Sequence, residues 1–300
     1  MNWQFFIEVL VSGLLAGVMY SLVALGFVLI YKASGVFNFA QGAMVFFAAL
    51  TFVSLIEKFG LNFWVAIVIT LAVMVVLGIS IERLVLRPLV NQPQITLFMA
   101  TIGLTFVLEG LAQLFWGSQP HGLELGIADE PIKWLSENAN INVSQFDLFA
   151  AAVAGTLVAA LAVFFQTTRI GRALRAVADD HQAALAVGIP LRQIWAIVWT
   201  VAGFVALVAG LLWGARNGVQ FALTFIALKA LPVLILGGFE SVAGAIVGGL
   251  IIGASEKLAE VYLGPFVGGG LESWFPYVLA LAFLLVRPEG LFGEKRIERV

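Results

Sequence analysis

Polar side chains that could contact a ligand are few in this chain, and four of them stand in apolar surroundings. Asn38 and Gln41 lie in S-G-V-F-N-F-A-Q-G, Glu109 lies in F-V-L-E-G-L-A-Q-L, and Lys229 lies in T-F-I-A-L-K-A-L-P. Amides and charged groups exchange hydrogen bonds or charge with a passing solute. Ionisable groups are costly in apolar segments, and where they occur they mark solute or ion routes. We therefore take these four residues as candidate lining of a passage.

Each of these candidates also has a structural interpretation. Glycines at 35 and 42 flank Asn38 and Gln41, so the two amides could instead cap helix ends in a turn. A buried Lys229 ammonium requires an opposite charge, and Glu109 is the most central acid available. A Lys229–Glu109 pair would lock two helices together, and Lys229 could alternatively extend to a membrane surface.

Catalytic and metal-binding chemistry is not favoured by the sequence. There is no Cys, so there is no thiolate metal site and no cysteine nucleophile. The two histidines, His121 and His181, are far apart in the chain and make a poor metal set. Neither H-E-x-x-H nor G-x-x-x-x-G-K-[ST] occurs. We expect a chain that is not an enzyme, holds no cofactor or metal and binds no nucleic acid.

The composition is that of a membrane protein. Hydrophobic residues make up 61% of the 300 positions and charged residues 11%, whereas a soluble domain carries about 25% charged residues. The mean hydropathy is +1.03. The N-terminus lacks the basic region of a cleaved signal peptide, so we interpret the first apolar segment as a retained span.

Nine apolar segments approach the roughly 20 residues that a helix needs to cross a bilayer. They are Phe6–Tyr31, Phe37–Ile56, Phe63–Leu86, Ile95–Trp116, Phe146–Gln166, Ile194–Ala215, Phe221–Leu236, Ala243–Leu258 and Trp274–Val286. Because an open sheet cannot satisfy its backbone in lipid, the segments must be helices. The sequence predicts an all-α, polytopic transmembrane helical bundle of about eight or nine spans, forming one domain over 1–300.

Basic residues in the loops indicate an orientation with the N-terminus outside and the C-terminus in the cytoplasm. With nine alternating segments, the inner loops hold eleven: Lys32, Arg83, Arg87, Arg169, Arg172, Arg175, Arg192, Arg287, Lys295, Arg296 and Arg299. The outer loops hold four, at Lys58, Lys133, Arg216 and Lys257. The reverse orientation would violate the positive-inside rule.

Two connecting segments are long enough to have roles of their own. The outer loop 117–145 is either a docking face for an external protein or a solvated connector. The inner segment 168–190 reads T-R-I-G-R-A-L-R-A-V-A-D-D-H-Q-A-A-L-A-V-G-I-P. It predicts a helix over Arg172–Val187 that stops at Gly188 and Pro190. This helix could dock into a protein groove or rest on the lipid surface.

Small residues recur four apart in several spans, as in Gly13/Gly17, Gly210/Gly214, Gly244/Gly248 and Gly249/Gly253. Such faces let helix backbones touch. Most of these faces should pack within the chain, and at least one would meet a second membrane subunit if a passage lay between two subunits.

The inner segment carries a resemblance to a known family. Gln182-Ala183-Ala184-x-x-x-Gly188 resembles the E-A-A-x-x-x-G core of the coupling loop in permease subunits of bacterial ABC importers, with Gln in place of Glu. The preceding G-R-A-L-R-A-V-A-D-D is similar to the loop of the branched-chain amino-acid (LivH type) permeases. Matches at Asn38–Gly42, where position 41 is often His in the family, and at Leu236–Gly249 extend the resemblance over most of the chain.

This resemblance implies a permease subunit in a bacterial cytoplasmic (inner) membrane. It implies a second, different permease, two cytosolic ATPases that bind the ATP, and an extracytoplasmic solute-binding protein that delivers branched-chain or related amino acids. The residues expected to couple the permease to the ATPases are Arg172, Arg175, Asp179, Asp180, Gln182, Ala184 and Gly188. The alternative is a self-sufficient secondary transporter or channel, which would need its own ion site or filter.

Overall fold

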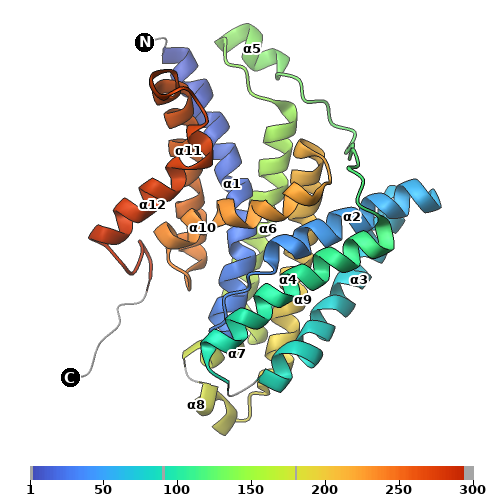
Figure 1. Ribbon diagram of the computed structural model, residues 1–300. Helices are drawn as coiled ribbons and strands as arrows, with labels where there is room; N and C mark the ends of the chain where they lie inside the picture. The colour runs from blue at the N-terminus through green and yellow to red at the C-terminus, as the bar shows by residue number, and fades with distance from the viewer. Residues whose placement is uncertain (1–2, 90–91, 180, 294–300) are drawn as a thin grey trace. The chain divides into compact units, whose positions relative to one another are not determined.

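The computed structural model describes residues 3–89, 92–179 and 181–293, without the side chains of Asp179, His181 and Gln182. Within these residues all regular structure is helical, apart from isolated bridges at His121–Val219 and Pro131–Ser144. The all-α prediction is therefore confirmed (Figure 1).

The first half of the chain contains α1 Trp3–Ser34, α2 Gln41–Phe59, α3 Phe63–Ile81, the π-helical turn η1 Glu82–Leu86, the 3₁₀ turn η2 Arg87–Leu89, α4 Gln94–Trp116 and α5 Lys133–Ala139. The second half contains α6 Gln145–Thr167, α7 Arg169–Asp179, α8 His181–Ala186, α9 Leu191–Asn217, the 3₁₀ turn η3 Phe221–Phe225, α10 Ile226–Gly237, α11 Val242–Val267, the 3₁₀ turn η4 Leu271–Ser273 and α12 Phe275–Val286.

Every predicted span coincides with an apolar helix. Seven helices among the described residues are long and apolar enough to cross a membrane, and two shorter ones cover Phe221–Gly237 and Phe275–Val286. The main difference is α11, which continues nine residues beyond the predicted end at Leu258, to Val267. Lys257, counted above with the outer loops, thus lies well within a helix.

The chain forms two compact units. One comprises residues 26–124 and 160–227, and its centre is α2, whose residues Gln41–Leu55 are all buried. Helices α4, α9 and the turn η3 pack against α2. A helix that is apolar on all sides is expected at such a central position.

The other unit comprises residues 1–25, 125–159 and 228–300. Here α1 and α11 cross at their glycines, with Gly13 and Gly17 facing Gly249 and Gly253. A Cβ atom added to Gly13 would lie 2.7 Å from the main-chain oxygen of Gly253. The backbones thus touch directly, as small residues at four-residue spacing predict.

The remaining predicted small-residue faces also pack within the chain. Gly248 of α11 lies against the main chain of α10 at Val233, and Gly210 of α9 lies against α2 at Val45. Among the described residues, each of the four glycine pairs thus contacts a neighbouring segment of the same chain. The expectation that at least one of them meets a second membrane subunit, if a passage lies between two subunits, stays a prediction.

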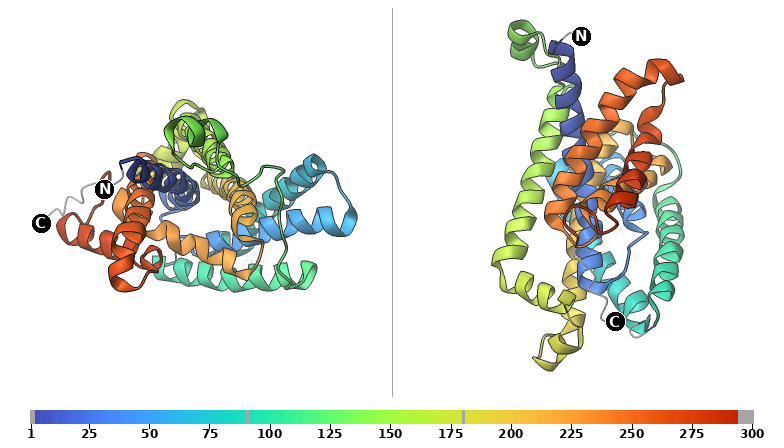
Figure 2. Two further views of the ribbon diagram at one scale, coloured as in Figure 1. Left: turned by 90° about the horizontal axis from the view of Figure 1, so that it is seen from above. Right: turned by 90° about the vertical axis from the view of Figure 1, so that its left-hand side faces the viewer.

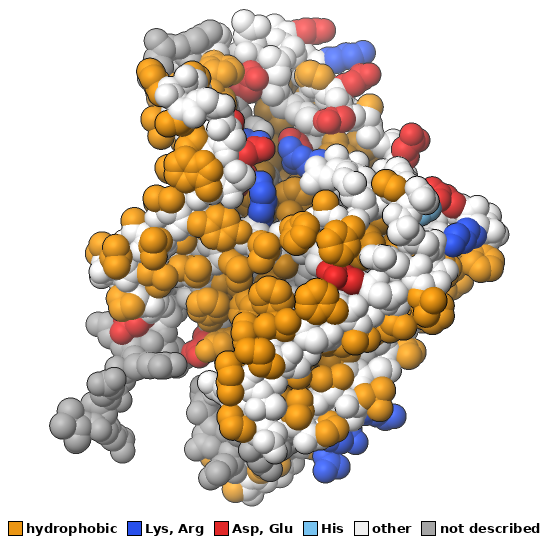
Figure 3. All heavy atoms as spheres, viewed as in Figure 1, with side chains coloured by type: hydrophobic (Ala, Val, Ile, Leu, Met, Phe, Trp, Pro, Cys, Tyr) orange, Lys and Arg blue, Asp and Glu red, His pale blue; other side chains and the backbone are white. Residues whose placement is uncertain are grey.

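Large apolar side chains also lie on the surface, as a lipid-facing protein requires. Examples are Val68 and Val76 of α3 and Phe106 and Leu114 of α4, each more than 60% exposed. Apolar side chains cover much of the face seen in Figure 3. This surface and the long helices together describe a multi-pass membrane protein.

Candidate functional site

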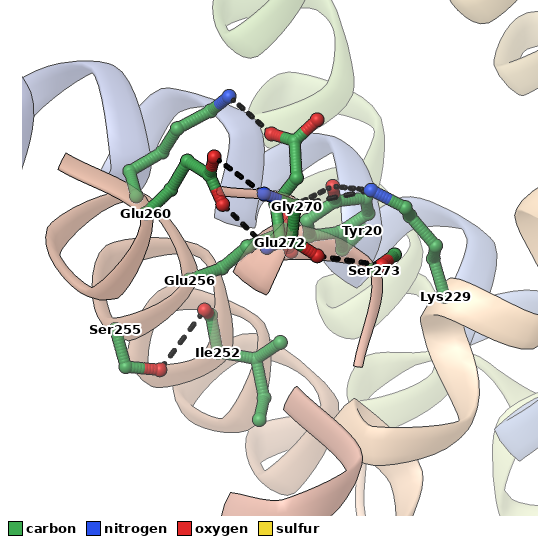
Figure 4. A network of polar contacts seen from close by, with 10 residues as sticks. Tyr20, Lys229, Ile252, Ser255, Glu256, Glu260, Gly270, Glu272 and Ser273 are labelled. Atoms are coloured by element: carbon green, nitrogen blue, oxygen red, sulfur yellow. Dashed lines mark hydrogen bonds and ion pairs between the residues drawn. The ribbon is translucent and has the colours of Figure 1, made fainter. Parts of the chain in front are cut away.

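A buried ion pair joins three helices of one unit (Figure 4). The Lys229 ammonium of α10 lies 3.1 Å from Oε1 of Glu256 in α11. The Tyr20 hydroxyl of α1 donates to the same oxygen at 3.1 Å, and Lys229 Nζ lies 3.5 Å from that hydroxyl. The Glu256 side chain is 2% exposed, whereas that of Lys229 is 35% exposed. The acidic partner of the pair is therefore buried, whereas the basic partner is partly exposed.

The sequence favours a different partner for Lys229, Glu109, as the most central acid available, with Glu240 nearer a membrane face. Since α11 runs from Val242 to Val267, Glu256 lies near the middle of the helix. Tyr20 was missed as well, because its position within α1 carries no signal until its neighbours are known.

One signal in the sequence points to Glu256. Gly249, Gly253, Glu256 and Glu260 follow one another at spacings of four, three and four, which is one stripe of an α-helix. The glycines of this stripe touch α1. A carboxylate that continues the same stripe is therefore expected to face α1 as well, and it does so at Tyr20.

A second set of polar contacts lies one turn further along α11 (Figure 4). Lys257 Nζ lies 3.0 Å from Oε2 of Glu272, and the Glu260 carboxylate accepts from the main-chain N–H groups of Gly270 and Glu272 at 2.9 Å each. Gly268, Gly269 and Gly270 have φ of +91°, +81° and +77°, values that favour glycine. Glu260 thus fixes the tight loop that leads to α12.

Glu109 lies in the other unit. It is 7% exposed in α4, beside Thr224 of η3. Neither Lys229 nor Glu256 belongs to this unit. The structure thus assigns Lys229 to Glu256, while the predicted role of Glu109 in lining a passage stays a prediction.

Asn38 and Gln41 form the turn between α1 and α2, and both are completely buried. Asn38 Oδ1 accepts from the Ala40 N–H at 3.1 Å, and its amide donates to Gln41 Oε1 at 3.2 Å. Gln41 Nε2 donates to the main-chain oxygen of Ala202 at 3.4 Å, and its side chain lies directly on Gly26 of α1. The amides hold the turn, but no side chain caps the first residue of α2. The predicted role of Asn38 and Gln41 in lining a passage stays a prediction.

The charged inner segment, for which the sequence predicts one helix over Arg172–Val187, is helical on both sides of Asp180, in α7 and in α8. Asp180 itself lies outside the described residues, as do the side chains of Asp179 and Gln182, so the single continuous helix stays a prediction. In the right-hand view of Figure 2 the chain turns sharply from the end of α6 into α7. Helix α7 begins at Arg169, three residues before the predicted start at Arg172.

Helix α7 is fastened to the end of α6. Gly171 packs against the main chain of Phe165 so closely that a Cβ atom would lie 2.6 Å from Phe165 Cα. Two guanidinium groups donate to the last main-chain oxygens of α6: Arg172 to Thr167 at 3.3 Å, and Arg175 to Phe165 at 3.1 Å and Gln166 at 3.4 Å. Cations at a helix C-terminus satisfy its unpaired carbonyls. These arginines therefore hold α7 in place.

Helix α8 ends as predicted. Gly188 has a φ of +85°, and the Ile189 N–H donates to the Ala184 oxygen at 2.9 Å, which is the glycine stop of a helix. Ala184 is buried, but Leu185 and Val187 are 54% and 76% exposed. The end of this segment thus presents apolar side chains.

The outer loop contains one short helix, α5. Its acidic side chains are mostly exposed, and the Asn142 N–H donates to Glu8 at 3.0 Å, which ties the loop to α1. No group of three or more His, Cys, Asp or Glu side chains with metal-site geometry occurs among the described residues. The loop's role as a docking face or as a connector stays open.

The long apolar helices and the buried charges at their centre define a multi-pass membrane transport protein. Residues 9–287 match the model of the family described as branched-chain amino acid transport system / permease component, and the chain belongs to this family. It is therefore a permease component of a transport system.

Curated relatives match over the whole chain. The high-affinity branched-chain amino acid transport system permease protein LivH of Salmonella typhimurium is 29% identical over 100% of this chain and 99% of its own length. The corresponding protein BraD of Pseudomonas aeruginosa is 28% identical over 98% of both chains. The fructose import permease protein FruF of Bifidobacterium longum is 24% identical over 79% of this chain and 66% of its own.

Proposed function

We propose that this chain is the membrane subunit of an ATP-driven ABC importer, which passes branched-chain or related amino acids across the bacterial cytoplasmic membrane. The family match over residues 9–287 is the observation that carries the proposal. Relatives similar over full length are named for branched-chain amino acids, whereas the fructose permeases match less of the chain at lower identity. This difference favours an amino acid over a sugar.

The energy would come from partners. Two cytosolic ABC ATPases would bind and hydrolyse ATP, a second permease would complete the passage, and an extracytoplasmic protein would deliver the solute. The chain itself would hold no cofactor. The excess of Lys and Arg in the predicted inner loops supports a cytoplasmic C-terminus, and α7 and α8 would then lie on the ATPase side.

The segment α7–α8 would receive the force of ATP-driven closure. Gly171, Arg172 and Arg175 join α7 to the last turn of α6, so a displacement of α7 would be passed to a membrane span. Leu185 and Val187 offer the exposed apolar surface that a protein groove would cover. Asp179, Asp180 and Gln182 would complete the docking surface, with Ala184 and Gly188 shaping it.

The passage would be lined by polar groups of the spans. Lys229 and Glu109 are the ionisable candidates, each set within a span. Asn38 and Gln41 would act indirectly, by keeping the turn between α1 and α2 in one conformation. The passage needs little binding energy of its own if the external protein selects the solute.

Co-purification tests the importer against a self-sufficient transporter or channel. A tagged form of this chain, expressed in its native host and extracted in mild detergent, should bring down an ATPase, and uptake by the reconstituted complex should require ATP. If the chain alone in liposomes moves leucine along or against an ion gradient, the importer assignment is overturned.

Substituting Leu185 and Val187 together by Asp should abolish the ATP hydrolysis that the loaded external protein stimulates. Removing two apolar anchors from a protein interface costs roughly 2 kcal/mol or more each, which is enough to release a partner. The measurement is co-purification of the ATPase together with stimulated hydrolysis. The matched control is Val76→Asn on the apolar surface of α3, which should leave ATPase binding intact, and equal loss in both variants would contradict the docking role.

A further inference from the structure

The presence of the Lys229–Glu256 ion pair within membrane spans needs an explanation. Tyr20 and Glu256 lie near the middle of the spans Trp3–Ser34 and Val242–Val267. Replacing a buried pair with apolar residues of similar size is often neutral or stabilising. Helix packing alone therefore does not explain why charges stand there, particularly as the glycines of α1 and α11 already bring these helices into contact.

The ammonium of Lys229 has capacity left for a ligand. It has three N–H donors, and among the described residues two acceptors are found, Glu256 Oε1 at 3.1 Å and the Tyr20 hydroxyl at 3.5 Å. Its side chain is 35% exposed, whereas its partner Glu256 is 2% exposed. The third N–H thus has no acceptor in the described part of the chain.

The free-energy cost of placing a charge in hydrocarbon indicates what the exposed part of the Lys229 ammonium faces. A charged group directed into hydrocarbon is strongly unfavourable, and charges within spans almost always face a water-filled cavity or the bundle interior. The exposed part of the ammonium should therefore face an aqueous passage. A solute in that passage can reach the ammonium but not the Glu256 carboxylate behind it.

Helix α10 has the form expected of a helix at a solute site. It is short, it follows the 3₁₀ turn Phe221–Phe225, and it contains Pro232. Proline has no N–H, so the Leu228 oxygen, four residues earlier and next to Lys229, lacks its helical donor. Short or proline-containing apolar segments of this kind point to the place where membrane transporters hold their solutes.

We propose that Lys229 Nζ binds the carboxylate of an amino acid as it passes, with Glu256 and Tyr20 as the residues that position the ammonium. This inference rests on the proposed function and adds a solute contact to it. Glu256 Oε1 competes with the solute for the same ammonium. That competition keeps the carboxylate from being held too tightly, as a passage that must release its solute requires.

Binding to the purified permease complex, without the external protein, tests the inference directly. The probes are leucine, isovalerate, which keeps the carboxylate, and isopentylamine, which keeps the amine, each detected by saturation-transfer NMR. Leucine and isovalerate should bind the native complex and isopentylamine should not. Lys229→Met should weaken both carboxylate probes by roughly tenfold or more, the effect expected for a lost hydrogen bond to a charged group.

Two further variants separate binding from folding. Lys257→Met removes the neighbouring lysine, whose side chain is 29% exposed and paired with Glu272, and should leave carboxylate binding unchanged. The double variant Lys229→Met/Glu256→Gln removes both charges and should assemble normally without binding isovalerate. Retained carboxylate binding in either Lys229 variant, equal loss in Lys257→Met, or no binding to the native complex would overturn the inference.

Transport measured on the same complex distinguishes the inference from the proposed function. If the native complex binds isovalerate through Lys229 but imports no amino acid with its partners, the proposed solute is wrong and the carboxylate site stands. If the native complex imports leucine and Lys229→Met does so at the native rate per ATP, the proposed function stands and the carboxylate site is wrong.

Discussion

Replacing Gly17 by leucine is expected to prevent this chain from reaching its folded state. A Cβ atom at this position would lie 3.0 Å from the main-chain carbon of Gly249 and 3.0 Å from Leu250 Cα, and it would be closer still to the Gly249 oxygen. These neighbours are backbone atoms of α11 and have no rotamer to change. The strain should therefore exceed the roughly 1–3 kcal/mol typical of overpacked side chains.

Relief would require α1 and α11 to separate, and their contact continues to Gly13 and Gly253. The variant should consequently elute as aggregate in detergent size-exclusion chromatography and show little protein in the membrane fraction. Gly110→Leu is the matched control, since Gly110 is exposed on the span α4 and has open space around its missing Cβ. If the Gly17→Leu variant folds and has the same melting temperature as the Gly110→Leu variant, the assigned packing of α1 on α11 is wrong.

The helices were predictable because the bilayer imposes their length and their backbone pairing. Predicted ends were wrong where a charged residue stood within a helix, and α11 is the main case. A hydropathy pattern treats Glu256 and Lys257 as the end of a span, but each has an opposite charge within about 3 Å. Pairing makes a charge tolerable within the helix, and the partner comes from a distant part of the chain.

In the charged inner segment, some features could be predicted from the sequence and the direction of the side chains could not. Its predicted cytoplasmic location rests on charge, and its stop at Gly188 rests on glycine conformation, both of which are local properties. The direction of the Arg172 and Arg175 side chains is not local. Both donate to the carbonyls of α6, a contact that the sequence pattern does not show, and the exposed apolar side chains of the segment lie further along, at Leu185 and Val187.

Asn38 and Gln41 show how much one turn leaves undetermined. Their buried amides were recognised from the sequence as either a solute contact or a cap. The choice depends on Gly26 and Ala202, which lie far away in the sequence and receive the Gln41 side chain. Residue type and spacing thus identified the polar groups, whereas their hydrogen-bond partners required the three-dimensional arrangement.

Substituting Glu256 by Ala is expected to destabilise the protein far more than substituting Glu272 by Ala. Both carboxylates pair with a lysine, at 3.1 Å and 3.0 Å, but their side chains are 2% and 43% exposed. Removing one partner of a buried pair leaves an uncompensated charge and costs about 3–5 kcal/mol. An exposed pair contributes about 1 kcal/mol at most.

The loss at Glu256 has two parts. Lys229 loses its carboxylate, and the Tyr20 hydroxyl loses the acceptor at 3.1 Å that ties α1 to α11. Thermal unfolding of the purified complex in nanodiscs should therefore show a clear drop in melting temperature for Glu256→Ala and almost none for Glu272→Ala. Because the Lys229 side chain is partly exposed, water can reach its ammonium, so the loss should fall toward the lower end of the range above. Equal melting temperatures for the two variants would mean that Lys229 is solvated without Glu256, and the pair would then have no part in holding α1, α10 and α11 together.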